Sequence, residues 1–204
     1  MPIPTYALST EQLGILAEKT LVNARELLDE AKALALLGHY PRGMKLAVLA
    51  GEEFGKHMMC FGAAGLRVDD EEMWKDFHQR FRSHAPKYED LFSMAASLMP
   101  DGEGERLMQD LDKHVKADQD RKMSALYVDL VDGDAIHPDE AIGPEEVRDA
   151  IVVFDGVISF WEKRFEDYDF GEVFAYGKTA GAERLRYALL EEDTETIRRM
   201  FEEE

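Results

Sequence analysis

The chain has 204 residues, a length typical of one domain, and 45% of them are hydrophobic. This composition excludes a disordered or collagen-like chain. The one cysteine, Cys60, excludes an internal disulfide and predicts a reducing environment. With 24 basic and 43 acidic residues the formal net charge is −19, so we expect no binding to double-stranded DNA, although a local basic pocket stays possible.

The chain shows no sign of a membrane segment or of a secretory signal. The amino-terminal residues lack a basic region followed by an apolar run, and no later segment approaches 18 uninterrupted apolar residues. We therefore expect a cytoplasmic protein without a membrane partner.

Apolar residues recur at intervals of three and four, which predicts helices throughout. The first helix should begin at Ser9, because Ser9 and Gln12 have capping-box spacing, and should end at Gly38. Pro41 opens a second helix that runs to about Ala64. This helix is apolar on both sides, which is typical of a central helix in a bundle.

A third helix is expected to start where Asp69 and Glu72 repeat the capping-box spacing. It should end near residues 100–102. Pro86 lies inside this span and should kink the helix, because proline lacks a backbone donor and clashes with the preceding turn.

The second half of the chain is expected to hold two more long helices. The fourth covers roughly residues 104–122, residues 126–131 are strand-like, and residues 132–143 read as an irregular loop. Pro144 opens the fifth helix, which carries an apolar stripe at Val147, Ile151, Phe154, Ile158, Trp161 and Phe165.

These elements predict an all-α protein, an up-and-down bundle of about five long helices that occupies residues 1–168. An acidic helical extension, residues 169–204, should pack on the bundle or trail it. Within it, residues 169–179 have few helix signals, and two short helices are expected over 180–190 and 194–201.

The second helix carries a cluster of charges in its apolar sequence. Glu52 and Lys56 are four residues apart and share a face, and Glu53 adjoins them. Surface ion pairing is one interpretation. The other is a pair of half-buried carboxylates that need a cation nearby, with Gly51 and Gly55 allowing close packing against a neighbouring helix.

Residues 74–88 form the most basic window, with four basic residues against one acid. Arg80 and His84 share a helix face, Lys87 follows one turn later, and Arg82 adds charge. The window is either a solvated basic face or a phosphate site. In a phosphate site an arginine binds phosphate oxygens and a histidine accepts a proton from a ribose hydroxyl.

A second basic pair, Arg121 and Lys122, precedes Tyr127 and Asp129. The two cations either compensate the dipole at a helix end or belong to a pocket. Tyr127 and Asp129 point the same way if this piece is extended.

Motifs for metal and cofactor chemistry are absent from the sequence. A di-metal helical bundle needs Glu-x-x-His on two helices, and the chain has none. It also lacks a Walker loop, G-x-G-x-x-G, CxxC and G-x-S-x-G. We therefore expect neither a metal nor a cofactor.

Three blocks of sequence, in this order, carry a resemblance to a known family. The first is residues 24–56, which end in Glu-Glu-Phe-Gly-Lys. The second is residues 81–87, with Phe-x-x-His-x-x-Lys, and the third is residues 121–129, a basic pair followed by Tyr-Val-Asp. Together they are similar to the AbiV abortive-infection proteins over roughly residues 10–165.

The resemblance implies the HEPN group of α-helical bundles, many of which are homodimeric, metal-independent RNases of toxin–antitoxin and phage-defence systems. In those enzymes an Arg-x(4–6)-His motif from each protomer meets across the dimer. The histidine activates the 2′-hydroxyl and the arginine stabilises charge on the phosphate. In this chain three residues separate Arg80 from His84 and seven separate Arg106 from His114, so neither pair has the motif's spacing.

Two functional hypotheses follow. The first is a phage-defence effector that acts on RNA or the translation apparatus and is expected to be a homodimer. In its enzymatic form it is a metal-independent endoribonuclease. Its catalytic residues would be His84 and Arg80; its phosphate ligands Lys87, Arg82, Arg121 and Lys122; and its supporting residues Glu52, Glu53, Lys56, Tyr127 and Asp129. The second hypothesis is a non-enzymatic helical module that arrests growth or phage development by binding a phage or host protein.

Overall fold

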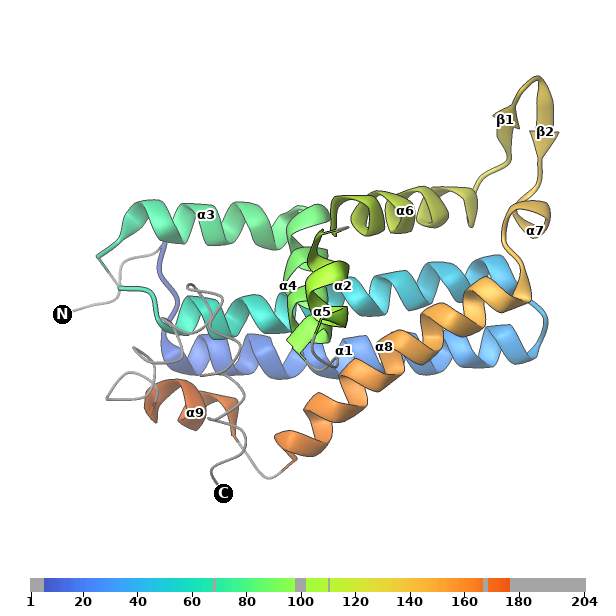
Figure 1. The fold of residues 1–204 in the computed structure, drawn as a ribbon. Coiled ribbons are helices and arrows are strands. Elements are labelled where there is room, and N and C mark those ends of the chain that lie inside the picture. Colours follow the sequence, from blue (N-terminus) through green and yellow to red (C-terminus); the bar gives the residue numbers. More distant parts are fainter. Residues whose placement is uncertain (1–5, 68, 98–101, 110, 167–168, 177–204) are drawn as a thin grey trace.

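The computed structural model describes residues 6–67, 69–97, 102–109, 111–166 and 169–176. The described part is all-α apart from one small hairpin, as predicted (Figure 1). Helix α1 (Thr10–Leu36) and helix α2 (Tyr40–Ala64) form an antiparallel pair. Ser9 caps α1, since its Oγ accepts a hydrogen bond from the backbone N–H of Gln12 at 3.0 Å and the Gln12 side chain accepts from Ser9 at 2.9 Å.

Helix α2 is the central element, which confirms the interpretation of its two apolar sides. It packs against α1, against α4 (Ala85–Ser97) and against α8 (Pro144–Arg164). Its side chains Met44, Val48 and Phe54 are at most 1% exposed. A polar side chain on this helix is therefore held in place by neighbours on several sides.

The prediction of one kinked helix from residue 69 to about residue 100 was wrong. Helix α3 (Glu71–Arg82) ends at Arg82, and Ser83 is extended with φ −83° and ψ 150°. Helix α4 then begins at Ala85, with Pro86 in its first turn, where the missing N–H of proline removes no helical hydrogen bond. Figure 1 shows α4 turning away from the direction of α3. The break places His84 at a corner.

The span predicted for the fourth helix holds α5 (Glu103–Gln109) and α6 (Leu111–Ser124). Strand β1 (Asp129–Val131) then pairs antiparallel with β2 (Asp134–Ile136), and Asp129 faces Ile136. Asp132 and Gly133 have φ of 52° and 94°, the positive values of a two-residue hairpin turn.

The prediction of an irregular loop over residues 132–143 was therefore wrong. The span holds β2 and the short helix α7 (Pro138–Ala141). The Asp-Gly pair between strand-forming residues was a hairpin signal in the sequence.

Helix α8 begins at Pro144 as predicted and buries Val147, Phe154, Ile158 and Trp161. The expectation of few helical residues over 169–179 was wrong, because α9 (Phe170–Tyr176) follows and packs against α1. Its Phe170 and Phe174, one turn apart, are 8% and 3% exposed. The helices expected over 180–190 and 194–201 lie outside the described residues.

His57 of α2 belongs to the core. Its ring is fully buried against Phe54, Trp161 and Phe170, and its Nδ1 lies 2.8 Å from the carbonyl oxygen of Ala17. Burial lowers the pKa of His57 to about 4. Among the described helices, none is both long enough and apolar enough to cross a bilayer.

Candidate functional site

The site is built around the carboxylate of Glu52, which is 3% exposed on the central helix α2. One carboxylate oxygen, Oε1, lies 2.6 Å from Nζ of Lys122 on α6. The other, Oε2, lies 2.7 Å from Nδ1 of His84 and 3.9 Å from Nζ of Lys87. These four residues form the Glu52 cluster. A buried carboxylate of this kind is stable only because cations and donors surround it.

The contact with Glu52 fixes the orientation of the His84 ring. A carboxylate oxygen accepts hydrogen bonds, so the 2.7 Å contact requires a hydrogen on Nδ1. In the neutral ring the lone pair is then on Nε2. The His84 side chain is 56% exposed, and its exposed part therefore presents a proton acceptor to solvent.

Two buried lysines complete the Glu52 cluster. Lys87 and Lys122 are 4% and 7% exposed, and Nζ of Lys122 lies 3.1 Å from Nδ1 of His84. Burial lowers the pKa of Lys87, and the nearby charge of Lys56 lowers it further. Burial alone would raise the pKa of Glu52, but hydrogen bonds from Lys122 and His84 outweigh it and hold that pKa below its usual value. At neutral pH Glu52 is ionised.

Lys45 also belongs to this region and was not among the predicted site residues. It lies on α2, seven residues and therefore two turns before Glu52, and is half-buried. Burial and the neighbouring charge of Lys122 lower the pKa of Lys45. The signal in the sequence was its spacing from Glu52, which places both side chains on one helix face.

The Lys56 ammonium forms an ion pair with Glu53 on the same helix and lies 5.5 Å from the centre of the Phe81 ring. This pair adjoins the Glu52 cluster without entering it. Lys45, Lys56, Lys87 and Lys122 together outnumber Glu52 and Glu53, so the site has a local charge of +2 before His84 is counted. Positive charge therefore gathers here in a chain whose net charge is −19.

The structure places the other predicted site residues elsewhere. Arg80 lies 3.4 Å from Glu89 in an ion pair between α3 and α4. Arg82 lines a surface hollow on α3 with Lys75 and His78. The other three are at and beyond the end of α6: Arg121 in its last turn, Tyr127, which is 58% exposed, and Asp129 at the start of β1.

A close contact between backbones positions α4, and with it Lys87. A Cβ atom on Gly55 of α2 would lie 2.0 Å from the carbonyl oxygen of Lys87, so only glycine permits this approach. The prediction that Gly51 and Gly55 serve close packing is confirmed for both, since a Cβ on Gly51 would lie 3.1 Å from Leu91 and Phe154. Within the described residues no group of three or more His, Cys, Asp or Glu side chains is arranged to hold a metal.

Comparison with protein families decides the assignment. The family model for AbiV, a HEPN family, matches residues 12–158, which is most of the chain. The chain belongs to the AbiV family. This membership places it among the abortive-infection proteins of phage defence. The matched AbiV segment includes every residue of the Glu52 cluster and ends within α8. No curated protein and no solved structure matches the chain.

Proposed function

We propose that this AbiV protein is a metal-independent endoribonuclease whose acid–base residue is His84. The observation that carries the proposal is the 2.7 Å contact between the buried Glu52 carboxylate and Nδ1 of an exposed histidine. Such a pair holds the imidazole in one tautomer and stabilises the charge that it acquires when Nε2 takes a proton. Glu52 is a positioning residue in this scheme.

In the proposed reaction Nε2 of His84 accepts the proton of a ribose 2′-hydroxyl. The resulting oxygen attacks the adjacent phosphorus, the bond from phosphorus to the 5′-oxygen breaks, and that oxygen takes a proton from solvent, to which His84 then returns the proton that it accepted. The products are a 2′,3′-cyclic phosphate and a 5′-hydroxyl. Lys45, Lys87 and Lys122 supply the positive charge that stabilises the phosphate oxygens as their charge grows.

This arrangement accounts for the departure from the Arg-x(4–6)-His spacing. Lys122 from α6 lies 3.1 Å from His84, whereas Arg80 is paired with Glu89. We infer that lysines from three helices take the part that the motif gives to arginine. Arg80, Arg82 and Arg121 would contact more distant phosphates of the same RNA.

The test uses purified protein and a labelled RNA pool in EDTA, with His84→Ala compared with wild type. We expect a loss in rate of about 10²- to 10⁴-fold, the usual contribution of a general base. The matched control is His39→Ala, since His39 is exposed at the start of α2. Cleavage that survives His84→Ala, or is lost equally in both variants, would refute the assignment.

Glu52→Gln keeps the shape of the side chain and removes its charge. As a positioning change it should lower the rate and shift the pH profile without weakening RNA affinity, because the cluster becomes more positive. A variant with an unchanged pH profile would show that Glu52 has no part in the reaction.

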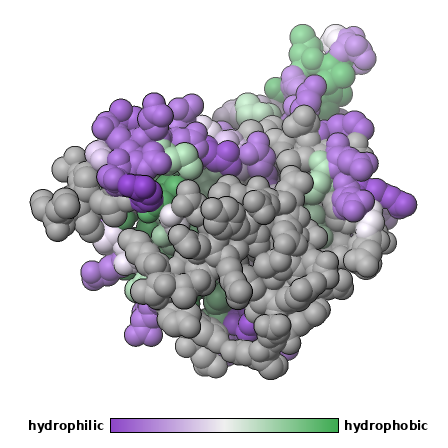
Figure 2. Space-filling model, turned by 60° about the vertical axis from the view of Figure 1, so that its left-hand side comes forward, coloured by the Kyte–Doolittle hydropathy of each residue, from purple (hydrophilic) through white to green (hydrophobic). Residues whose placement is uncertain are grey.

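A second candidate function is a non-enzymatic module that binds a phage or host protein. The hairpin and the residues just before it favour this function, because Leu130 and Val131 are 72% and 49% exposed and Tyr127 is 58% exposed. Figure 2 shows apolar side chains gathered on this protruding hairpin. If folded His84→Ala still arrests growth in cells, this second function holds and the enzymatic one fails.

We also propose that the protein is a homodimer, with the outer face of α8 as the contact. Val152 and Phe160 are 64% and 44% exposed, and Gly156 lies between them on the same face with open space above it. An apolar face with a central glycine allows a second helix to approach closely. Light scattering at micromolar concentration should give twice 23.2 kDa, and the monomer mass would reject the dimer.

A further inference from the structure

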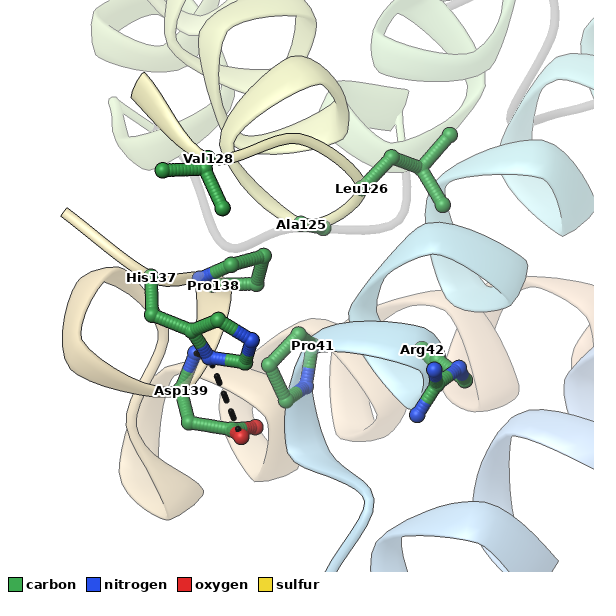
Figure 3. A pocket seen from close by; sticks show the side chains of 8 residues that line it. All are labelled: Pro41, Arg42, Ala125, Leu126, Val128, His137, Pro138 and Asp139. Atoms are coloured by element: carbon green, nitrogen blue, oxygen red, sulfur yellow. Dashed lines mark hydrogen bonds and ion pairs between the residues drawn. The ribbon is translucent and has the colours of Figure 1, made fainter. Parts of the chain in front are cut away.

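We infer that a cavity between the start of α2 and the base of the β-hairpin binds one nucleobase of an RNA strand that reaches His84. The inference rests on the proposed ribonuclease function and names a binding site outside the Glu52 cluster. The cavity has a volume of about 200 Å³. Its lining comes from three segments that are far apart in the sequence, the first turn of α2, the residues after α6, and α7 (Figure 3).

The walls of the cavity suit a flat, mostly apolar ring with polar edges. Pro41 and the neighbouring His137 ring lie on one side, and Leu126 and Val128 lie opposite (Figure 3). The cavity has few polar groups. Its acceptor is the carboxylate of Asp139, whose backbone N–H donates to Nδ1 of His137 at 3.3 Å, and its donor is Arg42. Small-molecule sites combine apolar walls with a few polar groups in this way.

The cavity and the Glu52 cluster lie on one line along α2. Lys45 lies four residues after Pro41, and Glu52 lies eleven residues after it. All three therefore share a helix face to within about 40°. The distance from Pro41 to Glu52 along the helix axis is about 16 Å at 1.5 Å per residue. On α6 the same order holds, since Lys122 contacts Glu52 and Ala125, three residues later, lines the cavity.

Two cations on this line form no ion pair among the described residues: Arg42 at the cavity, and Lys45 between the cavity and Glu52. Lys45 is half-buried and close enough to Glu52 to interact with its charge. Burial lowers the pKa of Lys45 and the nearby charge of Lys122 lowers it further, and together they outweigh the opposite effect of Glu52. In a chain with 43 acidic residues, leaving these two cations unpaired points to an anionic occupant. An RNA strand supplies both the anion and the ring.

The experiment measures binding of labelled RNA hexamers to the His84→Ala protein in EDTA, so that the RNA stays intact. Val128→Trp fills the cavity from an exposed position, since Val128 is 61% exposed. Its control is Val131→Trp, an exposed valine three residues later, in β1, that does not line the cavity. We expect Val128→Trp to weaken binding at least about fivefold, the lower end of what base stacking contributes.

Hexamers with an abasic site at each position in turn identify the nucleotide that faces the cavity. For the hexamer that is abasic at that position, Val128→Trp should cause no loss of binding affinity. Lys45→Ala should instead weaken every hexamer, abasic or not. It should also lower the slope of log K against log salt by about 0.7, the value for one phosphate contact on a single strand. Lys19→Ala removes an equal charge from an exposed site on α1 and should change neither quantity.

The outcomes separate this inference from the proposed function. Cleavage by the wild-type protein together with equal effects of Val128→Trp and Val131→Trp would overturn the base site and leave the ribonuclease standing. Binding that depends on Val128 and on the base, with no cleavage, would support the site and refute the catalytic role. A protein that binds no hexamer would overturn both.

Discussion

Replacing Gly55 by alanine should loosen the contact on which the candidate site depends. The added Cβ would lie 2.0 Å from the carbonyl oxygen and 2.6 Å from the carbonyl carbon of Lys87, whereas ordinary contacts begin near 3.4 Å. Both are backbone atoms, so relief requires α4 to move by more than 1 Å. Overpacking of this kind costs about 1–3 kcal/mol, and more where backbone must shift. The higher helix propensity of alanine returns about 1 kcal/mol.

Urea unfolding of three variants on one helix gives the assay. Gly62→Ala is the matched control, because nothing lies within 4 Å of its Cβ, and it should stabilise the protein by about 0.5–1 kcal/mol. The atoms nearest to a Cβ on Gly51 belong to the side chains of Leu91 and Phe154, at 3.1 Å, so the effect of Gly51→Ala should lie between the other two. If Gly55→Ala unfolds at or above the wild-type midpoint, the backbone contact between α2 and α4 is not as described.

Two further predictions concern buried charge. His57 takes up a proton near pH 4 when folded but near pH 6.5 when unfolded, so stability should fall by about 3 kcal/mol as the pH drops through this window. His57→Phe should abolish that fall in urea titrations at pH 7 and pH 4, and an unchanged slope would contradict it. Lys122→Met leaves Glu52 without its 2.6 Å partner and should cost up to about 3–5 kcal/mol at pH 7. Because the pKa of Glu52 is depressed, its contribution is lost on acidification below about 4.5, so the variant's deficit should shrink there, and an equal deficit at both pH values would contradict this account.

The first two helices could be predicted from the sequence because local chemistry sets their ends. The Ser9 capping box and the turn at Gly38, with φ 79°, depend only on residues nearby. The break between α3 and α4 was missed because a proline fits either a kink or a first helical turn. Packing of α4 on α2 across Gly55 selects the second, and no local pattern contains that contact.

The same distinction applies to the site. The sequence singled out Glu52, His84, Lys87 and Lys122 separately, from an interrupted apolar helix and two basic windows, and the structure brings the four together. The sequence offered no reason to place these four in the cluster rather than Arg82 or Tyr127, because a residue belongs to the cluster only if its helix face meets the others. Lys45 was missed although its spacing from Glu52 was visible in the sequence. A single lysine two turns from an acidic residue is common on solvated helices and does not by itself indicate a site.

If the protein acts on RNA as proposed, its charge distribution lets it select RNA without binding it indiscriminately. The net charge of −19 would repel a polyanion at long range, while Lys45, Lys87 and Lys122 would attract it at contact. At physiological salt the screening length is about 8 Å, so only a strand that already lies beside the cluster would interact with its charge. RNA affinity would then come from contacts to few phosphates. Contacts to a base would therefore contribute a larger share of the binding free energy than they do in a basic RNA-binding protein. A cavity for one base beside Arg42 is the kind of contact that such a balance requires.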